Sequence, residues 1–284
     1  MGMFDDVLLT VDYDQTLTSR DSSIPQRNLE AIRYFMENGG AFTVNTGRSI
    51  PMAQSIIKKV PVNAPLLLYN GSAAYDLETN HLCFCHNIQL DLWETICKCH
   101  ELFPDLTVEV QGVDAHYIFE ENPMWVAFCN HQPCANRIVP LGSNIGAFIK
   151  FTIYGQLRDI SVTDLFKASK EELAQMDKVE KILNEQFGQY CEVFRSADRI
   201  IDVHAKGVSK NRSARELQQR LGRKYLVCVG DAHNDISMLD GADFSFVPCD
   251  ATLNDRYPNV CSCDEGAVAD VIYKKIPEIL KNAP

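Results

Sequence analysis

The sequence predicts an α/β protein whose parallel-sheet core carries an inserted α+β domain. Two observations predict this fold class. In the first and last thirds of the 284-residue chain, short apolar runs alternate with helical patterns, as in a parallel sheet covered by helices. From about residue 80 to 190, stretches rich in aromatic and β-branched residues alternate with two helical ones, which indicates an antiparallel sheet in a separate domain.

The first third predicts the order strand, helix, strand, helix, strand. The run Val7–Val11 is short, aliphatic and followed by polar residues, so it predicts a buried strand. A helix is predicted after Ile24-Pro25, because apolar residues recur on one of its faces. Gly39-Gly40 ends it. The next elements are a strand at 41–45, a helix near 51–59 and a strand at 65–69.

The last third repeats this alternation. We expect a helix at 210–221, a strand at 225–229, a helix at 234–240, strands at 244–247 and near 260, and a final helix at 267–280. In the middle, helices are expected at 91–102 and 170–185, and strands at 106–110, 117–119, 148–154 and 190–195. The predicted domains are therefore a core of 1–80 and 191–284 around an insertion of 81–190.

The composition argues against several classes of protein. Hydrophobic residues make up 46% and charged residues 23%, which is typical of a packed globular chain and not of a disordered one. The formal net charge of -11 argues against nucleic acid or an anionic membrane as a partner. The sequence shows neither a secretory signal nor a run of about 18 apolar residues. We therefore expect a cytoplasmic protein.

The eleven cysteines include three C-x-C pairs, at 83/85, 97/99 and 261/263. A zinc site is one interpretation of such pairs. Common zinc knuckles use C-x2-C instead, and reduced thiols are the simplest state of cysteines in the cytoplasm. We expect small core residues at these positions.

Two carboxylates follow the first predicted strand, in the segment Val11-Asp12-Tyr13-Asp14. They lie at the carboxyl end of a parallel strand, where open α/β sheets hold their ligands. Two carboxylates this close repel each other unless a cation lies between them, and Mg²⁺ favours such oxygen ligands. The alternative interpretation is a polar turn after a strand.

Two further segments supply groups that suit a bound anion. Thr46-Gly47-Arg48 follows the next strand with a hydroxyl donor, an accessible backbone and a positive charge, although a helix N-cap at Thr46 is an alternative. Lys210 opens a predicted helix, where its charge opposes the helix dipole. Lys210 is therefore either a solvated lysine or a residue that holds phosphate.

A second pair of carboxylates, Asp231 and Asp235, follows the strand at 225–229. Asp235 could cap the next helix, but Asp231 lies in the turn before it, where no cap is needed. Asn234 lies between them at the start of the helix. All four polar segments follow strands of one predicted sheet, and their chemistry is complementary.

The order Asp-x-Asp-x-Thr, Thr-Gly-Arg, Lys, Gly-Asp-x-x-Asn-Asp resembles the haloacid dehalogenase superfamily. Asn70-Gly71, Gly207–Lys210 and Gly230–Leu239 are similar to its Cof-like phosphatases, which carry a type IIB cap. The resemblance covers both flanks of the chain and implies a Rossmann-like core, with the cap inserted between the second and third motifs. Gln15, where relatives usually carry Gly, and Ala232-His233 depart from the pattern.

The resemblance implies a magnesium-dependent phosphatase that acts on a small phosphomonoester. It implies that Asp12 is the nucleophile, which forms an aspartyl-phosphate, and that Asp14 is the general acid and base. Mg²⁺ is then held by Asp12, the main-chain carbonyl of Asp14 and Asp231, and Asp235 supports it through water or directly.

The remaining roles implied by the resemblance concern the phosphate and the substrate. Thr46, Gly47 and Lys210 bind the phosphoryl group. Asn234 orients Lys210 or the phosphate, and Arg48 faces the substrate.

Two alternatives stay open. A phosphohexomutase of similar fold needs clustered Arg or Lys in the inserted domain, which has few. A catalytically idle binding or regulatory protein does not need the full set of side chains, which is present here. Dinucleotide and P-loop binding are disfavoured, because neither glycine motif occurs.

The sequence leaves the substrate and the oligomeric state open. Sugar phosphates, nucleotides and phosphorylated cofactors all fit the proposed chemistry. The residues that set specificity are expected in the inserted domain, although aromatic residues there are more often core than ligand contacts. The candidates are Trp93, His116, Trp125, His131 and Tyr154.

Overall fold

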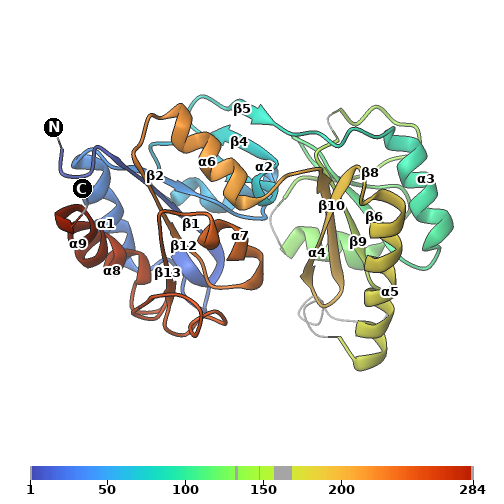
Figure 1. Ribbon diagram of the computed structural model, residues 1–284. Coiled ribbons are helices and arrows are strands. Elements are labelled where there is room, and N and C mark those ends of the chain that lie inside the picture. Colours follow the sequence, from blue (N-terminus) through green and yellow to red (C-terminus); the bar gives the residue numbers. More distant parts are fainter. Residues whose placement is uncertain (1, 132–133, 147, 157–167, 283–284) are drawn as a thin grey trace. The chain divides into compact units, whose positions relative to one another are not determined.

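The computed structural model describes residues 2–131, 134–146, 148–156 and 168–282, and it divides into two compact units (Figure 1). The first unit comprises Met1–Gly47, Lys58–Phe84 and Ser209–Pro284. The second comprises Arg48–Ile57 and Cys85–Val208. No helix in these described ranges is both long enough and apolar enough to span a membrane.

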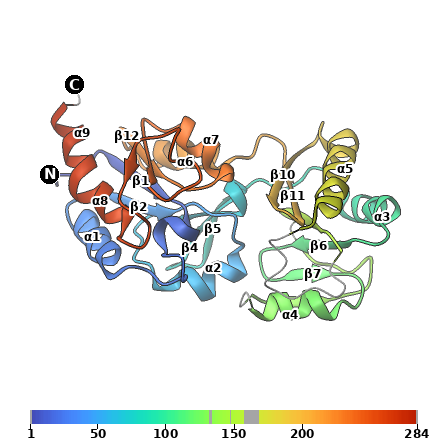
Figure 2. The same cartoon turned by 90° about the horizontal axis from the view of Figure 1, so that it is seen from below.

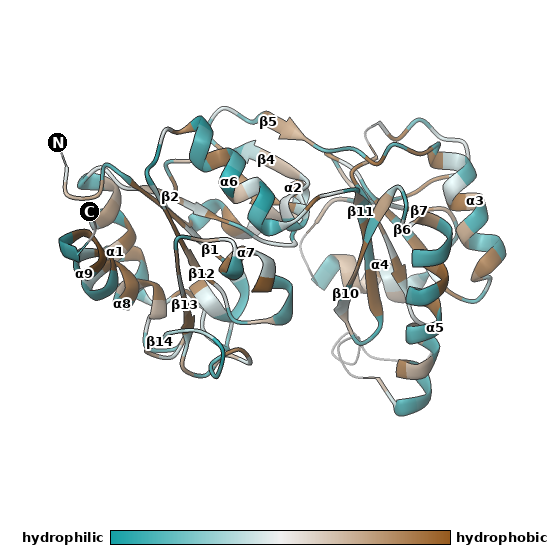
Figure 3. Ribbon diagram, viewed as in Figure 1, coloured by the Kyte–Doolittle hydropathy of each residue, from teal (hydrophilic) through white to brown (hydrophobic). Residues whose placement is uncertain are grey.

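The first unit is built on a five-stranded parallel sheet, in the order β14-β13-β12-β1-β2. The predicted α/β class is therefore confirmed for the core. Apolar side chains fill the strands because helices cover both faces, and Figure 3 shows these strands largely in brown. The strands are β1 (Val7–Val11), β2 (Ala41–Val44), β12 (Tyr225–Val229), β13 (Phe244–Pro248) and β14 (Asn259–Val260).

Helices pack on both faces of this sheet (Figure 1). On one face lie α1 (Gln26–Glu37) and α8 (Ala267–Asp270), and on the other lie α6 (Lys210–Arg220) and α7 (Ile236–Asp240). The last predicted helix is interrupted by a wider turn at Val271–Lys275, and α9 (Ile276–Asn282) follows it.

The strand predicted at 65–69 belongs to a smaller sheet. β3 (Leu66–Leu68) pairs antiparallel with β4 (Ala73–Asp76), and β5 (His81–Cys85) completes three strands. The chain reverses after β3 because Tyr69 and Asn70 both have left-handed backbone angles, with φ of 52° and 54°. A parallel bridge between Asn45 and Leu67 joins β3 to the end of β2.

The second unit contains a six-stranded sheet, in the order β10-β11-β9-β6-β7-β8. All neighbouring strands are antiparallel except β7 and β8, which are parallel. The strands are β6 (Thr107–Gln111), β7 (His116–Ile118), β8 (Asn136–Ile138), β9 (Lys150–Tyr154), β10 (Cys191–Ala197) and β11 (Ile200–Ala205).

Helices cover the two faces of this second sheet differently (Figure 2). α3 (Leu92–Leu102) and α5 (Lys170–Phe187) lie on one face and bury the main apolar cluster of the unit. α4 (Pro123–His131) lies on the other face, where Trp125 and Cys129 pack against Ile118 and Tyr154. α2 (Ile50–Ile56) also belongs to this unit.

The expected domain boundaries, 1–80, 81–190 and 191–284, differ from these units. The boundary at 190 left the residues of β10 and β11 on the core side, although a strand at 190–195 was expected in the middle of the chain. β10 pairs with β11, and β11 pairs with β9 in the second sheet, so the core resumes at Ser209. An apolar stretch does not reveal which sheet it will join, because pairing depends on contacts distant in sequence. α4, β4, β5, β8 and β11 were not predicted as separate elements.

Candidate active site

The carboxyl ends of β1 and β12 bring three carboxylates together. Asp12 directly follows β1, and Asp231 and Asp235 follow β12. The two strands are adjacent and parallel, and the Asp12 backbone N–H donates to the carbonyl of Val229 at 2.9 Å. One oxygen of each carboxylate lies within 4.8 Å of the others. The two acidic segments therefore meet at one edge of the sheet.

Lys210 lies between two of these carboxylates. Its Nζ donates to Asp12 Oδ1 at 2.6 Å and to Asp235 Oδ1 at 2.7 Å. The Lys210 side chain is 1% exposed, so it is not a solvated lysine. Asn45 Nδ2 donates to the Lys210 carbonyl at 2.9 Å, which joins the end of β2 to the start of α6. The sequence indicated no role for Asn45.

The crowding of these charges shifts their proton affinities. Burial raises the pKa of Asp12 well above its ordinary value, against the Lys210 ammonium, and the neighbouring carboxylates raise it further. Burial lowers the pKa of Lys210, but Asp12 and Asp235 outweigh this effect and leave it above its ordinary value. Burial and the charge of Asp235 raise the pKa of Asp231 to about 6. The cluster therefore carries more negative charge than Lys210 alone can balance.

The turn Tyr13–Leu17 supplies two more groups to this cluster. The charge of Asp14 raises the pKa of both Asp12 and Asp231, so the carboxylate lies close to them. Thr16 is buried, and its hydroxyl donates to Asp231 Oδ1 at 2.9 Å. Thr16 belongs to the first motif, but the sequence alone suggested no partner for it. Gln15 has a left-handed φ of 56°, which explains why glycine suits that position.

Thr46 and Gly47 lie at the end of β2, beside the end of β1. The backbone N–H of Asn45 donates to the Val11 carbonyl at 2.8 Å, and that of Asn70 donates to the Thr46 carbonyl at 3.0 Å. A Cβ on Gly47 would come within 2.9 Å of Asn70 Oδ1, so a larger residue here would displace the Asn70 side chain. Thr46 is buried.

The N-cap alternative for Thr46 is not what the structure has. The N-cap of α2 is Ser49, whose hydroxyl accepts from the Met52 N–H at 3.3 Å. Arg48 begins the stretch Arg48–Ile57 of the second unit, so it is not part of the same unit as the carboxylates.

Asp235 contacts Lys210, which was one of the two roles that the resemblance implied for Asn234. Asn234 is exposed, whereas Asp235 is fully buried and reaches Lys210. The other carboxylate oxygen of Asp235 accepts the backbone N–H groups of Asp231 at 3.1 Å and Ala232 at 3.2 Å. A Cβ on Gly230 would come within 2.6 Å of Asp235 Cβ, so glycine makes room for this carboxylate.

The donor set fits a hard divalent cation. The available ligands are carboxylate oxygens, which Mg²⁺ prefers. Burial, and then the neighbouring carboxylates, raise the pKa of Asp12 and Asp231, and a cation would favour their charged forms. The carboxylates of Asp12, Asp231 and Asp235 would hold the ion.

Comparisons with known proteins show the family of the chain. Residues 9–252 match a family described as haloacid dehalogenase-like hydrolase. A 5-amino-6-(5-phospho-D-ribitylamino)uracil phosphatase of Bacillus subtilis is 23% identical over 241 residues, which cover 83% of this chain and 80% of that protein. An HMP-PP phosphatase of Escherichia coli is 23% identical over 251 residues, covering 84% and 83%.

Solved structures show the same fold. A haloacid dehalogenase-like hydrolase from B. subtilis superposes with a TM-score of 0.76 at 18% identity, covering 94% of this chain and 99% of that one. A protein from Thermotoga maritima has a TM-score of 0.76 at 19% identity, covering 95% and 97%. At this level of identity the likeness concerns the fold.

Proposed function

We propose that this chain, which belongs to the haloacid dehalogenase-like hydrolase family, is a Mg²⁺-dependent phosphatase that forms an aspartyl-phosphate on Asp12. The family and the phosphatase names of its relatives support the reaction class. The observation that carries the proposal is the cluster at the ends of β1 and β12, where a buried lysine holds two of three converging carboxylates.

In the first step, an oxygen of the Asp12 carboxylate attacks the phosphorus of the bound ester. The bond between phosphorus and the ester oxygen breaks, and Asp14 gives its proton to the leaving alkoxide. Asp14 suits this role because it lies in the turn that follows Asp12, and its charge contributes to the raised pKa of Asp12. The products of this step are the free alcohol and the phosphorylated Asp12.

In the second step, water attacks the phosphorus of the aspartyl-phosphate. Asp14 takes a proton from that water, and phosphate leaves as the Asp12 carboxylate re-forms. Lys210 remains beside the Asp12 carboxylate, where its ammonium offsets negative charge on the phosphoryl oxygens. We assign phosphoryl binding to Thr46, Gly47 and Lys210, and we assign Arg48 to the substrate.

Asp12, the Asp14 carbonyl, Asp231 and Asp235 are proposed to hold Mg²⁺. The ion would supply electrostatic stabilisation to the phosphoryl group. Asp235 also positions Lys210, because one of its oxygens accepts from Nζ while the other accepts from two backbone N–H groups. For Asn234, which is exposed, we propose a contact to the phosphate and not to Lys210.

The substrate is proposed to be a small phosphorylated metabolite. The named relatives act on 5-amino-6-(5-phospho-D-ribitylamino)uracil and HMP-PP, and both compounds belong in the first panel of substrates. A cytoplasmic location, with no nucleic-acid or membrane partner, is part of the same proposal, and it rests on the charge of -11 and the reduced cysteines.

Phosphate release from p-nitrophenyl phosphate and from a panel of sugar, nucleotide and cofactor phosphates tests the proposal. We expect release with Mg²⁺ and none with EDTA. Asp12→Asn should reduce kcat on the order of a thousandfold or more, because it removes the nucleophile. Asp255→Asn, an exposed carboxylate of the same unit, is the matched control and should leave the rate unchanged.

Two results would contradict the proposal that this protein is a phosphatase. If no compound releases phosphate although the protein binds Mg²⁺, an idle binding protein is favoured. If phosphate moves between positions of a sugar phosphate and is not released to water, the phosphohexomutase alternative is favoured.

A further inference from the structure

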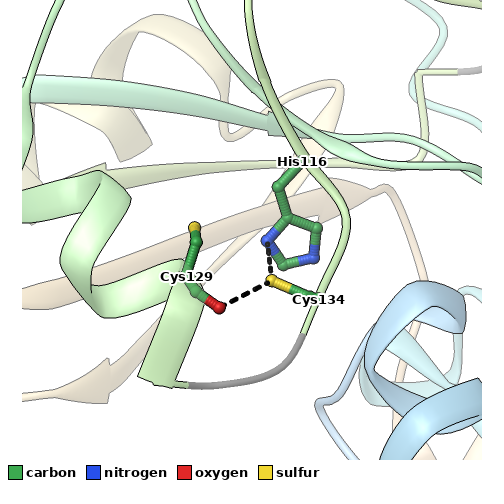
Figure 4. Close-up of side chains that lie close together, drawn as sticks. All are labelled: His116, Cys129 and Cys134. Carbon is green, nitrogen blue, oxygen red and sulfur yellow. Dashed lines mark hydrogen bonds between the residues drawn. The ribbon is translucent and has the colours of Figure 1, made fainter.

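The second unit holds a cluster of metal-binding side chains that the proposed reaction does not use. His116 lies on β7, Cys129 on α4 and Cys134 just before β8 (Figure 4). One ligand atom of each residue lies within 4.8 Å of the others. Cys134 Sγ is 3.8 Å from His116 Nδ1 and 3.8 Å from the Cys129 carbonyl oxygen.

The imidazole of His116 is oriented from its far side. Its Nε2 lies 2.7 Å from the Ser49 hydroxyl, which also caps α2. This contact leaves Nδ1 directed at Cys134 Sγ and at Glu109 Oε1, which is 3.5 Å away. Metal-binding histidines are commonly held in this way, with one ring nitrogen on the metal and the other in a hydrogen bond.

Glu109 adds a fourth donor to the cluster. Its side chain is fully buried and accepts hydrogen bonds from Gln111 Nε2 at 2.6 Å, Trp125 Nε1 at 2.5 Å and the Tyr154 hydroxyl at 3.3 Å. His116, Trp125 and Tyr154 were candidates for substrate contacts, and all three are buried around this carboxylate. Of the other two candidates, Trp93 packs on Phe119, and His131 is exposed at the end of α4.

The spacing suits a tetrahedral zinc ion. Zinc bonds of about 2.3 Å to sulfur and 2.0–2.1 Å to nitrogen or oxygen place neighbouring ligand atoms about 3.4–3.8 Å apart. The distances from His116 Nδ1 to Cys134 Sγ, 3.8 Å, and to Glu109 Oε1, 3.5 Å, lie in or near this range. Glu109 is not among the residues whose ligand atoms all lie within 4.8 Å of one another, so its carboxylate must move toward the two sulfurs to complete a four-ligand set.

We propose that His116, Cys129, Cys134 and Glu109 bind a zinc ion, which ties the chain between α4 and β8 to β7. Two thiolates and an imidazole favour zinc over magnesium, which prefers oxygen ligands. The ion offsets the buried charge of Glu109 and the two sulfurs, which His116 alone cannot neutralise. This site is structural and independent of the proposed phosphatase reaction.

From the sequence, zinc was considered only for the C-x-C pairs at 83/85, 97/99 and 261/263, where small core residues were expected instead, and not for Cys129 and Cys134. Cys129 and Cys134 have four residues between them, and their histidine precedes them on β7. All eleven cysteines are free thiols in this structure. Cys97 is exposed on α3, so it serves as a control.

Metal binding by the full-length, reduced protein tests the site. Zinc is titrated against a chromophoric chelator in excess Mg²⁺, and cobalt is substituted for zinc to record thiolate-to-cobalt charge-transfer absorption. That absorption requires sulfur ligands, so it distinguishes this site from the carboxylates of Asp12, Asp231 and Asp235. We expect one zinc per chain and a clear thiolate signature.

Cys129→Ser and Cys134→Ser should each weaken zinc binding by about 100-fold or more and remove the signature. Cys97→Ser should change neither. His116→Gln, which keeps a polar side chain, provides a further test if a serine variant does not fold, and it should also weaken zinc binding. Zinc affinity that is unchanged in Cys129→Ser would overturn the proposal. A wild-type protein that binds no zinc would also overturn it. This includes a protein that binds no zinc and whose Cys129 and Cys134 form a disulfide on treatment with hydrogen peroxide.

Discussion

At the scale of single residues, the site depends on contacts that the motifs only partly indicate. Asp12, Asp231 and Asp235 could be placed together because each follows a strand of one parallel sheet. The donation from Thr16 to Asp231 joins residues that are 215 positions apart, and no pattern along the chain reveals it. The same holds for Asn45, whose carboxamide reaches the backbone of Lys210. Side-chain partners of this kind appear only when the fold is known.

Removing the Thr16 hydroxyl should weaken metal binding. The hydrogen bond from Thr16 lowers the pKa of Asp231, so Thr16→Val should raise that pKa and loosen the carboxylate. We expect the Mg²⁺ concentration for half-maximal phosphatase activity to rise about tenfold. Thr16→Ser, which keeps the hydroxyl, should behave like the wild type. Equal Mg²⁺ dependence of the valine and serine variants would contradict this role of Thr16.

Replacing Gln15 by glycine should stabilise the protein. Gln15 has a φ of 56°, a conformation that costs a residue with a Cβ about 1–2 kcal/mol. Glycine removes this cost but adds about 0.5–1 kcal/mol of unfolded-state entropy, so the net gain should be about 1 kcal/mol or less. Urea unfolding measures the difference. Gln15→Ala keeps the Cβ and should give no gain, and a destabilised glycine variant would show that the side chain of Gln15 makes a needed contact.

At the scale of helices and strands, local patterns predicted most elements of the core. Val7–Val11 and Tyr225–Val229 are strands with the predicted bounds, because both are short apolar runs between polar residues. The sheet that each strand joins was harder to predict. β3 lies in a small antiparallel sheet because a turn with left-handed angles reverses the chain, and β11 joins the second sheet through pairing with β9. Such pairings depend on distant parts of the chain.

The start of α5 provides a test of stability against pH. Glu172 accepts from Arg199 Nη2 at 2.7 Å and from the Ser169 N–H at 2.7 Å, and the Arg199 contact is the main cause that lowers its pKa to about 2. Because the folded pKa lies below the ordinary value of 4.5, this stabilisation is present above pH 4.5 and is lost as the pH falls toward 2.

Glu172→Gln isolates this charge, since glutamine can still accept the Ser169 N–H. The melting temperature of the wild type should exceed that of the variant near pH 6. The difference should shrink below pH 4.5, where the wild-type carboxylate begins to lose its advantage. A difference that stays constant between pH 6 and pH 3 would contradict the ionic contact with Arg199.

At the scale of the whole molecule, the chain forms two units with separate cores. The first carries the converging carboxylates and Lys210, and its parallel sheet could be predicted because strand–helix alternation is a strong pattern. The second was predicted as an α+β insertion, but its extent to Val208 was not, because its last two strands follow α5 without a change in composition. The sequence motifs therefore predict the chemistry of the first unit, whereas no motif predicts the substrate contacts of the second.

The central claim is that phosphate is transferred to Asp12, and mass spectrometry of the acid-quenched enzyme tests it most directly. The protein is mixed with substrate and Mg²⁺, quenched during turnover and digested. We predict a phosphoryl group on the peptide that contains Asp12, stable in acid and lost in base, and absent from Asp12→Asn. Turnover with no phosphoryl group on that peptide, together with a fully active Asp12→Asn, would contradict the account.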